Sequence, residues 1–347
     1  MSPEEMPLLQ DGALQAGASG TIGAAESGPG SGKPRLPQNI GHRGYKAAFP
    51  ENSMAAFHGA VVAGAHALET DLHLSRDGVV VLSHDATLKR CFGIDTKIAD
   101  CDWSYLRTLQ TLQEPRQGMP RLSDLLEWLA RPELASVWLL LDIKTDDDPE
   151  VLLPAIARTV ASVPPWEGGK GWKEKIVVGA WNENYIHHAR LHLPGHALAY
   201  IGFSLLYARR FLSDQHPDVH FNLFQPSLVG PLGAAFRRAA RERGRKLFVW
   251  TVNEEEWMEW AVRKGVDGVI TDEVGRLSGV LDRLGAGAGV GGVVVVPGAK
   301  WPHALGLYAR AVVMQAAALV FSLLLWRRLS TMGSRRKPGS VTVPGKP

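Results

Sequence analysis

The sequence predicts an α/β fold of the TIM (β/α)₈ barrel type, and three observations lead to it. Short apolar runs alternate with segments of helical periodicity between residues 38 and 284. Nine of these runs are strand candidates, and two of them are joined by a turn that is too short for a parallel crossover. Setting one hairpin partner aside leaves eight parallel strands with helices between them, which indicates a closed barrel. A doubly wound open sheet is the alternative fold.

The candidate strands follow one another along the chain. They cover residues 39–42, 67–72, 79–84, 137–143, 175–181, 197–203, 221–225, 247–252 and 268–271. Ser75-Arg76-Asp77-Gly78 joins the second to the third, so we expect a small hairpin insertion there. The clearest helical patterns are 231–243 and 254–264, and the second opens with three glutamates that suit a helix N-terminus.

The N-terminal flank, residues 1–37, is rich in Gly, Ala, Ser and Pro without periodicity, so we expect a disordered arm. Glu4 and Glu5 precede no apolar core, so we expect no secretory signal. The net charge of +3 is too small to indicate a nucleic-acid partner. Cys91 and Cys101 favour free thiols in a reducing compartment, with one surface disulfide as the alternative. The oligomeric state has no sequence signal.

The C-terminal flank contains an apolar segment. A Gly-rich linker at 285–300 precedes the apolar segment 301–328, and a basic tail covers 329–347. The unbroken apolar run, 311–326, is shorter than the ~20 residues of a full membrane span, but two arginines follow it directly. We expect a membrane-associated helix, either spanning or lying in the interface, with a helix packed on the barrel as the alternative. The barrel is then expected to face the cytosol on an ER, mitochondrial or lipid-droplet surface.

Carboxylates follow the predicted strands at the end where a TIM barrel carries its active site. Glu69 and Asp71 are two residues apart on one strand and therefore point to the same face. Inward carboxylates repel each other unless a cation lies between them, and Asp142 offers a third oxygen ligand. We predict a divalent-cation site that suits Mg²⁺, Ca²⁺ or Mn²⁺. A solvent-facing acidic pair is the alternative.

Histidines and basic residues also lie at strand ends. His42 and His84 are expected to act as proton shuttles, because imidazole titrates near neutral pH. Arg43 is expected to bind a substrate phosphate through its guanidinium, with a surface salt bridge as the alternative. Lys144 is expected to stabilise negative charge that develops on the phosphoryl oxygens.

The motifs that carry these residues resemble those of the glycerophosphodiester phosphodiesterase family over residues 38–284. They are Gly41-His42-Arg43-Gly44, Pro50-Glu51-Asn52-Ser53, Glu69-Thr70-Asp71, Asp77-Gly78, His84-Asp85, Asp142-Ile143-Lys144, Trp250-Thr251-Val252-Asn253 and Gly268-Val269-Ile270-Thr271-Asp272. The resemblance implies a metal-dependent TIM-barrel enzyme that hydrolyses glycerol-linked phosphodiesters. It also implies that His42 and His84 are the acid/base pair and that Glu69 and Asp71 bind the metal.

Other positions follow from the same resemblance. The family usually has Glu at the third ligand position, where this chain has Asp142. Glu51 matches a position near the metal and Arg43 and is expected to bind either of them. Trp250 and Asn253 match the family's eighth-strand motif and are expected to support the site.

One subgroup is closer. Tyr45-Lys46-Ala47, Leu141-Asp142-Ile143-Lys144 and the apolar tail resemble fungal phosphatidylglycerol phospholipase C, in which Asp at position 142 is expected. This implies conversion of phosphatidylglycerol to diacylglycerol and glycerol phosphate. A soluble glycerophosphodiester phosphodiesterase and a lysophospholipase D are alternatives on the same scaffold. A catalytically silent protein that binds lipid head groups is an alternative of another class, although a pure binder need not keep two proton shuttles and a cation cage.

Overall fold

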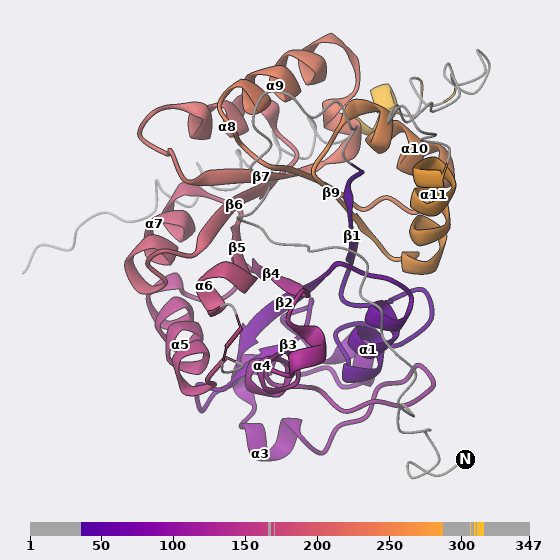
Figure 1. The fold of residues 1–347 in the computed structure, drawn as a ribbon. Helices are drawn as coiled ribbons and strands as arrows, with labels where there is room; N and C mark the ends of the chain where they lie inside the picture. Colours follow the sequence, from indigo (N-terminus) through magenta and orange to yellow (C-terminus); the bar gives the residue numbers. More distant parts are fainter. Residues whose placement is uncertain are drawn as a thin grey trace, which may run out of the picture.

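Eight parallel strands close into a barrel with helices on its outer side in the computed structural model (Figure 1). The structure describes residues 36–165, 168–169, 171–286, 306, 309 and 311–315. The parallel strands are β1 (Gln38–Gly41), β2 (Ala67–Leu74), β4 (Trp138–Ile143), β5 (Ile176–Ala180), β6 (Ala197–Gly202), β7 (Val219–Phe224), β8 (Leu247–Trp250) and β9 (Gly268–Thr271). Because β1 pairs with both β2 and β9, the ring is closed and the predicted barrel is confirmed over the open sheet.

The antiparallel strand β3 (Val80–Leu82) forms the predicted hairpin with β2. Leu72 lies opposite Leu82, and Leu74 lies opposite Val80. Gly78 in the connecting turn has a φ of 80°, in the left-handed region that glycine adopts without a steric penalty. The hairpin extends β2 above the barrel rim, so the chain that follows β3 starts beside the mouth.

The insertion between β3 and α4 (Leu122–Leu129) contains only short helices, α2 (Lys89–Phe92), η1 (Ile98–Asp100) and α3 (Trp103–Leu106). It has a small core of its own, which consists of Val81, Leu88, Ile98, Cys101, Leu106, Leu109 and Met119. Cys91 and Cys101 are both free thiols, as predicted. The insertion therefore packs against β3 through its own apolar residues and leaves the main core to the barrel.

The other helices cover the outside of the barrel (Figure 1). They are α1 (Met54–Val62), α5 (Pro149–Ser162), α6 (Trp172–Lys175), α7 (Glu183–His192), α8 (Leu205–Ala208), α9 (Gly230–Glu242), α10 (Glu255–Lys264) and α11 (Val274–Ala286), with the turns η2 (Pro132–Leu134), η3 (Arg209–Leu212) and η4 (Gln225–Leu228). The predicted helices 231–243 and 254–264 agree with α9 and α10 to within one residue at each end. Ser53 caps α1 by accepting a hydrogen bond from the Ala56 N–H at 3.1 Å.

Side chains alternate along each strand, and the inward set fills the barrel. The inward apolar residues are Ile40, Ala67, Trp138, Leu140, Val177, Ala199, Phe248 and Ile270. Two residues further toward the C-terminal end, the same alternation reaches His42, Glu69, Asp142, Trp250 and Asp272. The strand pattern thus supplies an apolar interior below and a polar cluster above it.

The predicted C-terminal helix falls largely outside the described residues. Of the segment 301–328, the structure describes 306, 309 and 311–315. Ala311 is 1% exposed, and the Gln315 Nε2 donates to the Pro226 carbonyl oxygen at 2.6 Å. Residues 311–315 therefore lie against the barrel, and membrane attachment of the segment stays a prediction.

The remaining terminal predictions also fall mostly outside the described residues. The predictions concern a disordered arm at 1–37, a linker at 285–300 and a basic tail at 329–347. Of these ranges, the structure describes only residues 36, 37, 285 and 286. In the described part of the chain, every helix is too short or too polar to pass through a bilayer.

Trp138→Ala should lower the free energy of unfolding by about 3–5 kcal/mol. The substitution removes a buried indole from the barrel interior and also the hydrogen bond from Trp138 Nε1 to Gln38 Oε1, 2.8 Å long. Urea unfolding followed by circular dichroism measures the change. Leu191→Ala, on the exposed surface of α7, is the control and should change stability by less than about 0.5 kcal/mol. Equal losses in the two variants would contradict the role given to Trp138.

Candidate active site

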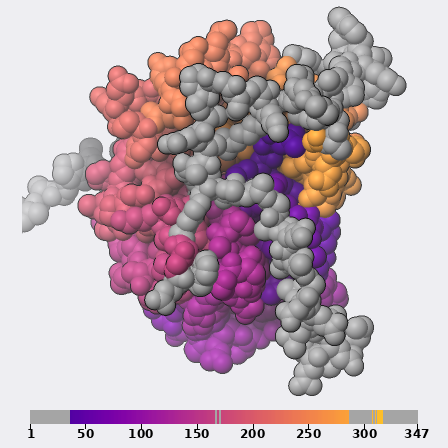
Figure 2. Space-filling view, viewed as in Figure 1, coloured from indigo at the N-terminus to yellow at the C-terminus, as the bar shows by residue number. Residues whose placement is uncertain are grey.

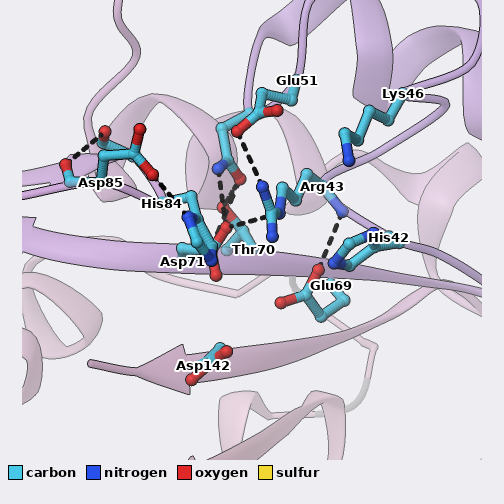
Figure 3. A network of polar contacts seen from close by, with 12 residues as sticks. His42, Arg43, Lys46, Glu51, Glu69, Thr70, Asp71, His84, Asp85 and Asp142 are labelled. Carbon is cyan, nitrogen blue, oxygen red and sulfur yellow. Dashed lines mark hydrogen bonds and ion pairs between the residues drawn. The ribbon is translucent and has the colours of Figure 1, made fainter. Parts of the chain in front are cut away.

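Three buried carboxylates meet at the C-terminal end of the barrel. Glu69 and Asp71 come from β2, and Asp142 comes from β4, where it is the register partner of Asp71. One oxygen of each carboxylate lies within 4.8 Å of the other two, and none of the three residues is more than 6% exposed. The side chains converge in Figure 3. The structure thus brings together the predicted metal ligands and excludes the solvent-facing alternative.

Two cations lie against this cluster. The Lys144 Nζ is 2.7 Å from both Asp71 Oδ1 and Asp142 Oδ2, and the Arg43 Nε is 3.1 Å from Asp71 Oδ2. Burial by itself would raise the pKa of Asp71, but Lys144 and Arg43 outweigh burial and hold that pKa well below its usual value. Burial, together with Asp71 and Asp142, raises the pKa of Glu69 well above its usual value. Positive charge in the cluster is therefore insufficient for three ionised carboxylates.

A divalent cation at the cluster would supply the missing positive charge. The donor set consists of carboxylate oxygens only, which hard cations such as Mg²⁺ and Ca²⁺ prefer. The Trp181 Nε1 donates to Asp142 Oδ1 at 2.7 Å, and the Asn52 Nδ2 donates to Asp71 Oδ2 at 2.9 Å. These bonds fix the two aspartates in place, as partners of metal ligands commonly do. The residues present therefore fit a metal ion at Glu69, Asp71 and Asp142.

Arg43 occupies a turn that the surrounding groups hold in an uncommon conformation. Its φ is 56°, in the left-handed region, and a non-glycine residue there costs roughly 1–2 kcal/mol. The Arg43 backbone N–H donates to Glu69 Oε2 at 2.8 Å, and its guanidinium donates to Glu51 Oε1 at 2.9 Å. At Gly44, with a φ of 80°, a Cβ would come within 2.6 Å of the Ala56 backbone. The turn places the guanidinium inside the mouth rather than in the alternative surface salt bridge, and its role in phosphate binding stays a prediction.

His42 is oriented by a carboxylate from the last strand. The His42 Nδ1 is 2.6 Å from Asp272 Oδ1, and the Asn253 Nδ2 donates to Asp272 Oδ2 at 2.8 Å. Burial would raise the pKa of Asp272, but its bonds to His42 and Asn253 lower it to about 2. The anionic Asp272 therefore keeps a proton on Nδ1, and the Nε2 of His42 remains for chemistry. Asn253 thus contacts the site through Asp272, and its supporting role stays a prediction.

His84 has a separate carboxylate. The His84 Nδ1 is 2.7 Å from Asp85 Oδ1. Burial lowers the pKa of His84, and Arg43 and Lys144 lower it further, against the attraction of Asp71. The neutral imidazole with a proton on Nδ1 and a free lone pair on Nε2 is therefore favoured near neutral pH. In the described part of the chain, neither histidine has a hydrogen-bond partner at Nε2.

Arg90, on α2 of the insertion, connects both halves of the site. Its guanidinium donates to Asp85 Oδ2 at 2.7 Å and to both oxygens of Glu51 at 2.7 Å. Glu51 in turn holds Arg43, so one chain of ion pairs joins His84 to the predicted phosphate-binding residue. Glu51 lies outside the carboxylate group at the predicted metal site. Of its two expected partners, the structure shows Arg43.

Aromatic rings form one wall of the mouth. Trp181 follows β5, Trp250 ends β8 and Phe224 ends β7. The ring centroids of Trp181 and Trp250 are 5.7 Å apart, and those of Phe224 and Trp250 are 5.4 Å apart. The Trp250 Nε1 donates to the Asn222 carbonyl oxygen at 3.0 Å, which fixes its ring. Trp250 therefore supports the site as a wall rather than through contact with the carboxylates.

Sequence reasoning missed several residues of this site. Asp272 and Asp85 were visible within motifs but had no assigned role, although Asp272 follows β9 with the inward alternation of Ile270. Trp181 lies two residues after the inward Gly179, so the same alternation could have identified it. Arg90 had no signal, because it lies in a segment without periodicity and reaches the site only through the fold of the insertion.

Comparison with known proteins agrees with this geometry. The family model of the glycerophosphoryl diester phosphodiesterase family matches residues 42–276. A glycerophosphodiester phosphodiesterase of Caldanaerobacter subterraneus is 26% identical over 250 residues, 67% of this chain and 93% of that protein. A lysophospholipase D of Rattus norvegicus is 28% identical over 288 residues, 72% of this chain and 88% of the rat protein.

Solved structures share the fold. A phosphodiesterase of Oleispira antarctica, in complex with the product sn-glycerol-3-phosphate, superposes with a TM-score of 0.62 at 23% identity and covers 71% of this chain and 97% of its own. A glycerophosphoryl diester phosphodiesterase from Silicibacter pomeroyi superposes with a TM-score of 0.64 at 21% identity, over 73% and 95% of the two chains. Since the family model spans the carboxylate cluster and both histidines, the chain belongs to the glycerophosphoryl diester phosphodiesterase family and is a phosphoric diester hydrolase.

Proposed function

We propose that the chain hydrolyses phosphatidylglycerol to diacylglycerol and glycerol phosphate with the help of a divalent cation. The observation that carries the proposal is the pair of histidines, each oriented by its own carboxylate, beside a buried carboxylate cluster that fits a cation. Two residues on which the resemblance to phosphatidylglycerol phospholipase C rests lie in this site. Lys46 is 3.7 Å from Asp272, and Asp142 accepts a hydrogen bond from Lys144.

The two histidines have different electrostatic surroundings, which suggests a division of roles. Arg90 shares the negative charge of Asp85, and Arg43 and Lys144 further disfavour a charged His84. The lowered pKa of His84 suits it to accept a proton, which leaves donation to His42, whose Nδ1 is held by Asp272. We assign proton acceptance to His84 and proton donation to His42.

In the proposed reaction, His84 takes a proton from the attacking hydroxyl, which belongs either to water or to the neighbouring carbon of the head-group glycerol. Attack by water gives glycerol phosphate directly, whereas attack by the glycerol hydroxyl gives a cyclic phosphate that a water molecule then opens to glycerol phosphate. A new P–O bond forms, the bond from phosphorus to the diacylglycerol oxygen breaks, and His42 gives that oxygen a proton. Arg43 and Lys144 neutralise the charge on the phosphoryl oxygens. A divalent cation held by Glu69, Asp71 and Asp142 would supply Lewis-acid polarisation of the phosphate.

The C-terminal segment belongs to this proposal. A phospholipid stays in its bilayer, so an enzyme for it gains from attachment to the surface. Residues 316–326 are apolar apart from Ser322, and Arg327 and Arg328 follow. We propose that segment 301–328 attaches the barrel to a membrane at the ER, mitochondria or lipid droplets, with the barrel facing the cytosol.

A lysophospholipase D is the second candidate. The rat relative of that name is aligned over 72% of this chain. The two candidates break different bonds of the same phosphodiester, because the phospholipase D reaction leaves the phosphate on the lipid. The site is compatible with either orientation of the substrate.

Product analysis separates the candidates. Phosphatidylglycerol in mixed vesicles should yield diacylglycerol and glycerol phosphate, and lysophosphatidylcholine should be cleaved at least about tenfold more slowly. Thin-layer chromatography and mass spectrometry measure the products. Phosphatidic or lysophosphatidic acid as the main lipid product would reject the phospholipase C assignment in favour of the second candidate.

His42→Ala and His84→Ala should each lower kcat by about 10²-fold or more, because general acid–base catalysis typically contributes that much. The initial rate on glycerophosphoglycerol and the melting temperature should be measured together. His187→Ala, on α7 and outside the site, is the matched control and should keep full activity. A variant of either site histidine that retains most of its activity removes that residue from the mechanism.

Addition of Mg²⁺, Ca²⁺ or Mn²⁺ should raise the melting temperature of the wild type, because ligand binding to the folded state stabilises it. A chelator should reverse the rise and abolish hydrolysis. Asp71→Asn and Asp142→Asn should lose most of the rise, whereas Asp218→Asn, on the far side of the fold, should retain it. An unchanged response in both site variants would contradict the ligand assignment.

A further inference from the structure

Large apolar side chains are exposed in one sector of the barrel mouth. Leu206 on α8 is 80% exposed, and Leu232 in the first turn of α9 is 72% exposed. Their helices follow the C-terminal ends of the neighbouring strands β6 and β7, so both leucines lie at the same end of the barrel as the carboxylate cluster. Figure 2 shows α8 and α9 at the outer edge of the molecule, salmon to orange at the top of the view.

The loops that carry these leucines are joined to each other and to the end of the described chain. The Ser227 Oγ donates to the Phe203 carbonyl oxygen at 2.6 Å, which links the loop after β7 to the loop after β6. The Gln315 Nε2 donates to the carbonyl oxygens of Pro226 at 2.6 Å and Val229 at 3.4 Å. Residues 311–315 are therefore fixed to the same sector.

Residues 311–315 add apolar surface to this sector. Ala311 is buried against the barrel, whereas Val312, Val313 and Met314 are 61%, 69% and 45% exposed. Elsewhere in the described chain, large exposed apolar side chains are dispersed, for example at Val62, Leu112 and Leu191. Single exposed apolar residues are ordinary, whereas a gathering of them beside a site marks an interaction surface.

The chain beyond residue 315 indicates what covers this surface. In the sequence, residue 315 is followed by residues 316–326, in which Ser322 is the only polar residue, and then by Arg327 and Arg328. Arg209 and Arg210 are exposed directly after α8. Apolar side chains bordered by arginines suit the interface of a bilayer that contains anionic lipid.

We propose that Leu206, Leu232 and residues 311–315 form an apolar sector that inserts into the surface of a bilayer containing anionic phospholipid. Leu206 and Leu232 lie on the barrel domain itself, so insertion would fix the orientation of the mouth toward the lipid headgroups. The proposal rests on the proposed function only in that the substrate is a lipid.

A fluorescent label tests insertion at single positions. In full-length protein carrying Cys91→Ser, an environment-sensitive fluorophore is attached to Leu206→Cys, Leu232→Cys or Leu191→Cys. Leu191 is 62% exposed but lies in the last turn of α7, at the opposite end of the barrel, and is the matched control. Vesicles of phosphatidylglycerol and phosphatidylcholine should shift the emission at positions 206 and 232 to shorter wavelength and leave position 191 unchanged.

The charged variant gives a second measurement. Leu206→Asp/Leu232→Asp should weaken sedimentation with the same vesicles by about tenfold or more, since each lost apolar contact removes at least a factor of several in binding. Leu191→Asp should bind as the wild type does. Emission at 206 and 232 that stays as it is in solution, or a double variant that binds like Leu191→Asp, overturns the proposal.

Both measurements are independent of turnover, so the two proposals can fail separately. A blue shift at 206 and 232 without hydrolysis of phosphatidylglycerol would leave docking intact and reject the substrate. Hydrolysis of phosphatidylglycerol without the blue shift would leave the substrate intact and reject docking by this sector.

Discussion

The repulsion among Glu69, Asp71 and Asp142 is the constraint on which the rest of the site depends. Burial of an ion in a protein interior costs several kcal/mol unless other charges compensate. The compensation here comes from Lys144, directly after β4, and from Arg43, in a left-handed turn between β1 and α1. The apolar barrel below excludes water, so these charges act on one another at close range. Three carboxylates held in this way are suited to a cation and to a phosphate that accompanies it.

The two histidines differ in their surroundings, because the carboxylate that contacts each one has a different second partner. Each has a carboxylate at Nδ1, but Asp272 is paired with an amide and Asp85 with a guanidinium. The second arrangement, together with Arg43 and Lys144, favours a neutral imidazole at His84. A hydrolase that must remove one proton and deliver another can use such a difference without any change in its fold.

Much of this arrangement follows from the sequence because period-two alternation in a barrel is strict. Once Ile40, Leu140 and Ile270 are taken as inward, the residues two positions later must lie in the mouth, which places His42 and Asp142 correctly. The short connection after β2 likewise required an antiparallel β3. Arg90 could not be predicted, because its contacts with Glu51 and Asp85 depend on the tertiary packing of an aperiodic insertion. The association of residues 311–315 with the barrel depends equally on contacts between segments distant in sequence.

The separate core of the insertion has a consequence for how disturbances reach the catalytic groups. Leu88, Ile98 and Leu106 pack with one another and with β3, while a single guanidinium on α2 reaches the catalytic groups. Loosening of this small module, by heat, by a protease cut or by a bound partner, would remove Arg90 from both Asp85 and Glu51, the carboxylates that contact His84 and Arg43, while the barrel kept its shape. The enzyme thus contains a region through which its turnover can change independently of its global stability.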